Sequence, residues 1–269
     1  VYAAMVDRLD QGLGNVVSAL EKRKMLDDTL ILFLADNGGC AEGMGRRRGI
    51  QYKDKDPDQL KPMKPTDLQT DMIPRRTREG VVVKQGTEVM TGGPDTYHGY
   101  GLAWANASNT PFRQYKHWVH EGGISSPLVA HWPNGIDEKL NGKTDDQPTH
   151  LIDLMATCVD LGNATYPKKV EGREIVPLQG VSIAPAFSGR KINRPNPIFW
   201  EHEGNRAIRI GKWKLVAKGA RGAWELYDID EDRTELNDLS EKQPGRAKEM
   251  ANLWEAWAIE AKAKPWPWG

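Results

Sequence analysis

Apolar residues at helical spacing open the chain. Met5, Leu9, Leu13, Val16, Val17 and Leu20 fall on one face of a helix, with Asp, Arg, Glu and Lys on the other. We therefore predict an amphipathic helix over Val1–Lys24. After a turn at Asp27 and Asp28, the continuous apolar run Leu30–Ala35 has the length of a strand that is covered on both faces. A helix followed by a buried strand is typical of an α/β layer.

The middle of the chain contains a long irregular stretch and then further regular elements. Residues 43–103 lose periodicity and are rich in Gly, Pro, Lys, Arg and Asp, which indicates an irregular insertion with Gly80–Lys84 as a candidate short strand. Pro127–Trp132 is predicted to be a second buried strand. Thr149–Leu161 is predicted to be a helix, with Thr149 as its N-cap and Gly162 just past its end.

The carboxyl-terminal part has a different pattern, in which short strand-like runs alternate with Gly and charged turns. These runs predict an antiparallel sheet and are Ile198–Glu201, Asn205–Ile210, Trp213–Ala217 and Trp224–Asp228. A last amphipathic helix, expected to pack across the sheet, is marked by Met250, Leu253, Trp254, Trp257 and Ala261. The predicted fold class is thus α/β over residues 1–195, followed by a small α+β domain over residues 196–269.

Charge and composition exclude several classes of function. The 37 basic and 37 acidic residues cancel, and the chain has no long basic block, so nucleic acid is an unexpected partner. The longest apolar run falls far short of the roughly 20 residues that a membrane-spanning helix needs. Cys40 and Cys158 form neither a disulfide framework nor a zinc motif, and we expect both to be idle thiols.

The first candidate site follows the predicted strand directly, as Asp36-Asn37-Gly38-Gly39. Ligands bind at the carboxyl ends of strands in open α/β sheets, and carboxylate and amide oxygens are donors that Ca²⁺ or Mg²⁺ accepts. The two glycines would let the backbone approach a ligand closely. The same four residues are also favourable turn chemistry, so on spacing alone both interpretations stay open.

A second element, from Asn109 to Ile124, precedes the second predicted strand and contains Lys116 five residues before Glu121-Gly122-Gly123. The combination of strand, Asp-Asn-Gly, this lysine, Glu-Gly-Gly and an apolar strand ending in Trp-Pro resembles the sulfatase family. Trp200-Glu201-His202-Glu203-Gly204-Asn205-Arg206-Ala207 and Trp224-Glu225-Leu226-Tyr227-Asp228 resemble the family's small carboxyl-terminal domain. The resemblance implies part of an alkaline-phosphatase-like α/β sandwich followed by a small antiparallel sheet with a helix.

The resemblance also implies roles for particular residues. Asp36 and Asn37 match a pair of calcium ligands, and Lys116 matches a lysine that holds the oxygens of a sulfate ester. Family members attack sulfate with a formylglycine made from a Cys or Ser in a Cys/Ser-x-Pro/Ala-x-Arg motif. Neither Cys40 nor Cys158 lies in such a motif. We therefore expect the nucleophile and the amino-terminal half of the catalytic domain to lie upstream of this chain, which alone would be inactive.

Other polar and aromatic residues have simpler interpretations. His117 and His120 are expected to pack or to form hydrogen bonds rather than to act as general acids. His98 is a candidate substrate-binding residue in the irregular segment. The tryptophans near the carboxyl terminus, namely Trp254, Trp257, Trp266 and Trp268, are expected to pack the small domain.

Two alternatives to a calcium-dependent sulfuric ester hydrolase remain open at this point. One is a non-catalytic, sulfatase-like fragment or anion-binding paralogue, and the other is a phosphoric ester hydrolase of the same superfamily. An upstream Cys-x-Pro-x-Arg motif would favour the sulfatase. Because the chain does not begin with Met, its compartment is not set by the sequence, although export or a periplasmic location is typical of many bacterial relatives.

Overall fold

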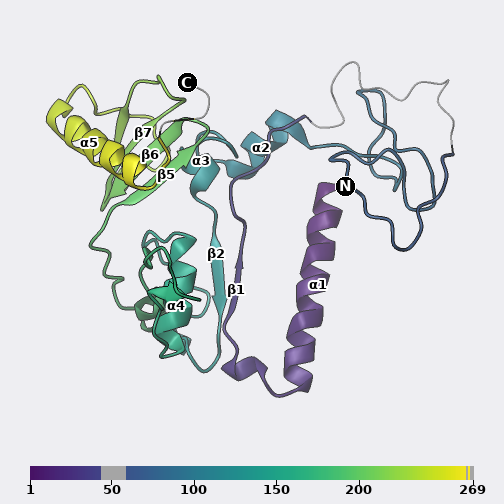
Figure 1. Ribbon diagram of the computed structural model, residues 1–269, viewed down its shortest axis with the longest axis horizontal. Coiled ribbons are helices and arrows are strands. Elements are labelled where there is room, and N and C mark those ends of the chain that lie inside the picture. The colour runs from purple at the N-terminus through teal and green to yellow at the C-terminus, as the bar shows by residue number, and fades with distance from the viewer. Residues whose placement is uncertain (44–58, 265, 267–269) are drawn as a thin grey trace. The chain divides into compact units, whose positions relative to one another are not determined.

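The computed structural model describes residues 1–43, 59–264 and 266, and its contacts divide the chain into two compact units (Figure 1). The first unit comprises Val1–Leu13 and Asn37–Ser125, and the second comprises Gly14–Asp36 and Ser126–Gly269. The domain boundary that we predict between residues 195 and 196 stays a prediction. Among the described residues, no helix is both long and apolar enough to cross a bilayer.

Helix α1 spans Tyr2–Lys22, as the spacing of apolar residues predicts. None of its residues is buried, and Met5, Leu9 and Val16 expose 66%, 56% and 54% of their surface. Leu13, Val17 and Leu20 are half-buried, so the apolar face of this helix is only partly covered by the described residues.

Residues 59–100 are irregular, as the sequence pattern predicts, with isolated bridges but no helix and no regular strand. That this segment is an insertion stays a prediction. The candidate strand Gly80–Lys84 is wrong as a continuous strand, because only Val81, Val82 and Lys84 within it form such bridges. The part of the insertion at residues 44–58 lies outside the described residues. Two short helices that the sequence pattern does not predict follow, α2 (Gly101–Asn109) and α3 (Glu121–Ile124).

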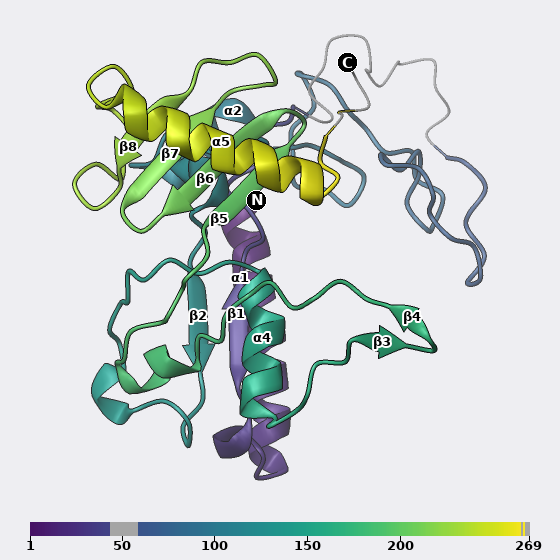
Figure 2. The same ribbon diagram turned by 60° about the vertical axis from the view of Figure 1, so that its left-hand side comes forward.

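Strands β1 (Ile31–Leu34) and β2 (Leu128–His131) lie side by side in the second unit and pair antiparallel, with Leu34 opposite Leu128 (Figures 1 and 2). The predicted strands are confirmed within one or two residues at each end. The prediction that both faces of these strands are buried is wrong for the described residues, because Phe33 and Val129 expose 41% and 58% of their surface. Among the described residues, this sheet has only these two strands.

Helix α4 spans Ile152–Leu161, and Gly162 follows it as predicted. Thr149 is not its N-cap, because the helix begins three residues later and Leu151 occupies the cap position. The buried carboxylate of Asp153 instead accepts hydrogen bonds from the backbone N–H groups of His150 and Val181 and pairs with Arg194.

The remaining short elements of the second unit connect these strands and helices. They are the 3₁₀ helices η1 (Leu26–Asp28), η2 (Glu138–Leu140) and η3 (Ala184–Ser188), and the two-residue strands β3 (Lys169–Val170) and β4 (Arg173–Glu174).

The carboxyl-terminal sheet is confirmed as four antiparallel strands in the order β5-β6-β7-β8. Helix α5 (Pro244–Glu260) crosses this sheet in both views (Figures 1 and 2). The strands are β5 (Ile198–His202), β6 (Asn205–Ile210), β7 (Trp213–Ala217) and β8 (Glu225–Asp228). The core between sheet and helix consists of Ile208, Leu215, Leu226, Met250, Trp254 and Ala258. Trp257 and Trp266 pack against it as expected, whereas Trp268 lies outside the described residues.

The molecule thus has a mixed α/β fold with a carboxyl-terminal antiparallel sheet followed by a helix, which is the predicted class. The second unit also contains a fully buried charged pair. The Lys214 ammonium is 2.8 Å from a carboxylate oxygen of Glu235, and both side chains are fully buried.

Candidate functional site

The two sequence elements that we singled out meet through their backbones in the first unit. The N–H of Gly38 donates to the carbonyl oxygen of Gly123 at 3.0 Å, and the N–H of Lys116 donates to the carbonyl oxygen of Gly39 at 3.0 Å. Because β1 and β2 are antiparallel, the residues that follow β1 and those that precede β2 emerge at the same end of the pair. The glycine pair after β1 and the loop that carries Lys116 are therefore held together.

Asn109 fastens the same junction from the end of α2. Its side-chain oxygen accepts from the N–H of Gly39 at 2.9 Å, while its amide nitrogen donates to the carbonyl oxygen of Gln114 at 3.0 Å. One side chain thus joins the glycine pair to the loop that leads to Lys116. The sequence pattern gives no signal for this role, because a single Asn at a helix end is usually a cap or turn residue.

The glycines at this junction lie too close to neighbouring atoms for a side chain to fit. A Cβ at Gly38 would lie 1.8 Å from the carbonyl oxygen of Gly122, and a Cβ at Gly122 would lie 2.2 Å from that of Gln114. A Cβ at Gly39 would lie 2.4 Å from the hydroxyl oxygen of Tyr100. Asp-Asn-Gly-Gly is therefore more than a local turn, because its glycines allow a distant segment to pack against it.

Lys116 presents a partly exposed cation beside this junction. Its ammonium is 3.8 Å from a carboxylate oxygen of Glu42, and the two side chains expose 41% and 57% of their surface. An exposed pair at this distance contributes little to stability. The ammonium therefore remains available to an anionic ligand at small energetic cost.

Asp36 and Asn37 supply two hard oxygen donors at the end of β1. Asp36 is exposed and Asn37 is half-buried. Asp36 belongs to no group of three or more His, Cys, Asp or Glu side chains that could hold a metal within the described residues. Ca²⁺ takes about 6–8 oxygen ligands, so these two donors fit part of a calcium shell and leave most of it to other groups.

His98, the candidate substrate-binding residue, lies in the irregular segment of the first unit. Its Nε2 is 3.1 Å from the carbonyl oxygen of Gly86, and its buried Nδ1 has no hydrogen-bond partner among the described residues. The contact with Gly86 explains how the ring is held. Its role toward a substrate stays a prediction.

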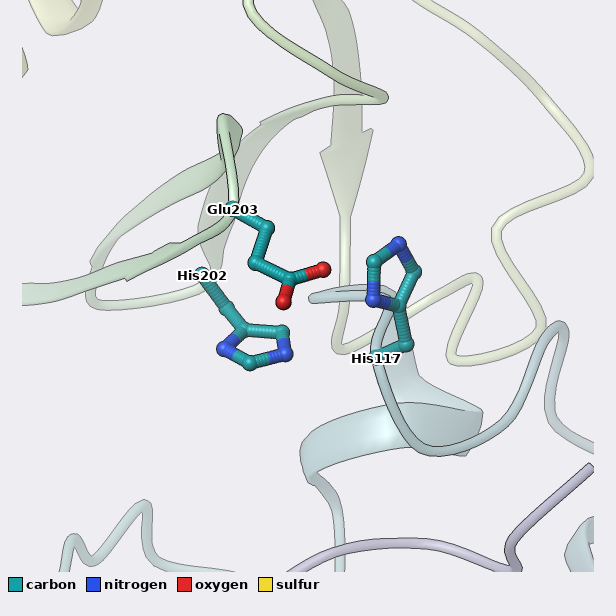
Figure 3. A group of neighbouring side chains, drawn as sticks. All are labelled: His117, His202 and Glu203. Atoms are coloured by element: carbon teal, nitrogen blue, oxygen red, sulfur yellow. The ribbon is translucent and has the colours of Figure 1, made fainter. Parts of the chain in front are cut away.

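The two histidines expected to pack do make such contacts. The ring of His117 lies edge-on to Trp118 with ring centroids 4.9 Å apart, and His120 is fully buried. Figure 3 labels His117 together with His202 and Glu203, which are adjacent residues at the turn between β5 and β6 of the second unit. Glu203 has a positive φ of 50°, as expected in a tight turn.

Both cysteines are free thiols, with Cys40 half-buried and Cys158 exposed. This agrees with the expectation that neither takes part in a disulfide. Since neither lies in a Cys-x-Pro-x-Arg sequence, the structure adds no candidate for the family's nucleophile.

Similar proteins carry the same pattern over most of the chain. The sulfatase family model matches residues 1–164, and the model for the carboxyl-terminal part of N-sulphoglucosamine sulphohydrolase matches residues 112–260. An uncharacterised sulfatase of Schizosaccharomyces pombe is 29% identical and aligns with 97% of this chain and 43% of its own length. A choline-sulfatase of Rhizobium meliloti is 26% identical over 91% of this chain and 33% of its own length.

Solved structures show the same fold. The crystal structure of Ps i-CgsB superposes with a TM-score of 0.62 and 24% identity, over 96% of this chain and 42% of that one. The structure of BT4656 in complex with its substrate D-glucosamine-2-N,6-O-disulfate gives a TM-score of 0.54 and 17% identity, over 98% of this chain and 41% of that one. At less than 25% sequence identity, both structures share the fold of this chain. The chain spans less than half the length of these relatives, and with most of its residues matched by the sulfatase model it belongs to the sulfatase family.

Proposed function

We propose that this protein hydrolyses sulfate esters, with Asp36 and Asn37 as ligands of a calcium ion and Lys116 as a catalytic residue that contacts the sulfate group. The observation that supports this most directly is the hydrogen bond from the N–H of Lys116 to the carbonyl oxygen of Gly39. It fixes the lysine loop beside the segment that directly follows Asp36 and Asn37. Membership of the sulfatase family gives the reaction class.

The roles of these residues follow from their charges. The Lys116 ammonium would stabilise the negative charge that builds up on the oxygen atoms of the ester while the S–O bond breaks. The oxygens of Asp36 and Asn37 would hold and orient the metal. Bound Ca²⁺ would supply Lewis-acid polarisation of the sulfate oxygens.

The nucleophile in this proposal is a formylglycine carried by a segment upstream of this chain. Exposed apolar residues on two elements support the existence of a covering segment. On α1, Met5 and Leu9 are more than half exposed, and on the β1–β2 pair the same is true of Val129. Apolar residues at such regular spacing normally pack against another element of the fold.

The experiment compares the full-length protein with two variants, Asp36→Ala and Lys116→Ala, using an aryl sulfate that releases a coloured phenol. Asp36→Ala should lower both the calcium content of the purified protein and its turnover. Lys116→Ala should lower turnover by roughly 100-fold or more with the calcium content unchanged. Lys191→Ala removes an exposed lysine elsewhere and serves as the control. If calcium content and turnover are both unchanged in Asp36→Ala, Asp36 is not part of the site. If turnover is unchanged in Lys116→Ala, Lys116 is not part of the site.

The same measurements separate the two alternative functions. A full-length protein that turns over phosphate esters and not sulfate esters would be a phosphoric ester hydrolase. A protein without the upstream Cys/Ser-x-Pro/Ala-x-Arg motif and without turnover would be a non-catalytic relative. The 269-residue chain alone should be inactive, because removing an activated nucleophile typically costs several orders of magnitude in rate.

A further inference from the structure

An open cavity of about 470 Å³ lies in the irregular segment of the first unit. Its walls combine apolar and charged side chains, among them Leu60, Met63, Asp67, Asp71, Arg75 and Arg76. None of these residues belongs to the site proposed above. A cavity that holds two adjacent arginines is a candidate binding site for an anion.

The wall that carries the arginines is a small hairpin. Arg76 forms an antiparallel bridge with Val82, and the N–H of Val83 donates to the carbonyl oxygen of Arg75 at 3.0 Å. The tight turn of this hairpin ends at Gly80, which is buried and has a φ of 93°. A Cβ at Gly80 would lie 2.2 Å from the carbonyl oxygen of Leu60, so only glycine fits there.

The opposite wall is fastened to this hairpin by backbone hydrogen bonds. The N–H of Leu60 donates to the carbonyl oxygen of Gly80 at 2.7 Å, and the N–H of Met63 donates to that of Arg78 at 2.8 Å. The Arg78 guanidinium also donates to the carbonyl oxygens of Lys64 and Pro65, at 3.2 and 3.1 Å. The cavity therefore has a built scaffold, although this segment contains no helix or regular strand.

The charged side chains in and beside the cavity differ in whether they already form hydrogen bonds. Arg78, beside the cavity, donates to the backbone of the opposite wall. The carboxylate of Asp67, which lines the cavity, accepts from the N–H of Lys64 at 2.8 Å. By contrast, the guanidinium groups of Arg75 and Arg76 take part in no hydrogen bond or ion pair with another described residue. Arg75 and Arg76 thus both line a cavity that also contains the carboxylates of Asp67 and Asp71.

We propose that this cavity binds an anionic saccharide unit, with Arg75 and Arg76 holding a sulfate or carboxylate group. Guanidinium forks match the oxygens of both groups, while Asp71 and Asp67 would accept hydrogen bonds from sugar hydroxyls. Leu60 and Met63 supply apolar surface for the C–H face of the ring. Taking this unit as part of the substrate rests on the proposed function, so the substrate would carry a second anionic group besides the ester that is cleaved.

The test measures binding rather than turnover, by titration calorimetry on the 269-residue chain. The probe is a disaccharide that carries one sulfate and one uronic acid carboxylate, compared with its desulfated, carboxyl-reduced and neutral forms. We expect the neutral form to bind weakest. If the desulfated form binds more weakly than the carboxyl-reduced form, the arginines hold the sulfate, and the opposite order indicates the carboxylate. Higher salt should weaken binding of the charged forms, because the cavity is open to solvent.

Arg75→Ala/Arg76→Ala should weaken binding of the charged probe by about tenfold or more. Arg75→Lys/Arg76→Lys keeps both charges and loses the planar guanidinium groups, so its affinity should fall between that of the alanine variant and that of the wild type. The matched control is Arg173→Ala/Arg221→Ala, which removes two exposed arginines of the second unit. Circular dichroism checks each fold, and if the alanine pair unfolds, Arg75→Gln/Arg76→Gln carries the same expectation.

The proposal is overturned if the wild type binds the neutral and charged probes equally, or if the cavity variants bind as the control does. Turnover of a small aryl sulfate by the full-length protein tests the proposed function separately. Binding that depends on the arginines, without any turnover, would leave the cavity assigned and refute the hydrolase. Turnover by the full-length protein, together with probe binding that does not change in the arginine variants, would support the hydrolase and refute the cavity proposal.

Discussion

Replacing Gly38 by alanine tests whether the two halves of the candidate site are packed as the structure shows. The new Cβ would lie 1.8 Å from the carbonyl oxygen and 2.9 Å from the carbonyl carbon of Gly122, whereas real Cβ contacts essentially never fall below 3.0 Å. Both nearest atoms belong to backbone, so no side-chain rotation relieves the clash. The segment after β1 must move away from the loop by more than 1 Å, from 1.8 Å to at least 3.0 Å.

The size of the effect follows from what this movement breaks. Separating the segments loses the hydrogen bond between the N–H of Gly38 and the carbonyl oxygen of Gly123, about 1 kcal/mol. Overpacking of well-packed backbone costs a further ~1–3 kcal/mol. The smaller conformational entropy of alanine in the unfolded chain returns about 0.4–1 kcal/mol. We expect a net destabilisation of roughly 1–3 kcal/mol, and turnover of the full-length protein should fall about 100-fold, because an ångström of misplacement has that effect.

Urea unfolding of the chain and aryl sulfate turnover by the full-length protein measure the two effects. The control is Gly12→Ala in α1, where an added Cβ would meet no atom within 4 Å. This change should stabilise the helix by roughly 0.5–1 kcal/mol and leave turnover unchanged. If Gly38→Ala behaves like Gly12→Ala in both assays, the close crossing of the two segments is wrong and the argument for the site loses its geometric basis.

Two further predictions concern the second unit. Lys214→Met should lower the free energy of unfolding by about 3–5 kcal/mol, because it leaves the buried carboxylate of Glu235 without its cation. Lys169→Met, at the exposed pair of Lys169 with Glu174, should cost under about 1 kcal/mol. Equal effects in urea unfolding would contradict this. Burial lowers the pKa of His150 from its ordinary value of 6.5, against the opposing attraction of Asp153. The unfolded chain therefore binds more protons than the folded chain between that lowered pKa and 6.5, so stability should be full above pH 6.5 and fall as the pH drops through this window. His150→Gln should flatten this dependence of the thermal unfolding midpoint on pH, and an unchanged slope would count against it.

Elements whose contacts are local in sequence were the ones that the sequence predicted well. The four strands β5 to β8 follow one another with short turns, so each strand's pattern of apolar residues is completed by its neighbour. Helix α5 follows the same logic, because Met250, Trp254 and Ala258 recur at a spacing of four and meet the sheet.

Predictions that depend on distant contacts were less successful. The apolar run at β1 predicts burial on both faces, but only β2 pairs with it among the described residues, so Phe33 stays partly exposed. Thr149 has the chemistry of an N-cap, yet the helix start is set by Asp153, whose buried carboxylate accepts from the N–H of His150 and of Val181. A residue that reaches 28 positions along the chain leaves no trace in a local pattern.

The candidate site combines both kinds of information. Asp36 and Asn37 were predictable because they end an apolar strand, and Lys116 because of its spacing from Glu-Gly-Gly. What the sequence left open was whether Gly38 and Gly39 serve a local turn or a ligand. The structure gives a third reason for Gly38, since a Cβ there would lie 1.8 Å from the carbonyl oxygen of Gly122 in the facing segment. Gly38 is needed because of the other segment, and two backbone hydrogen bonds join the same two motifs. The position of the Lys116 loop therefore depends on residues that carry no chemistry themselves.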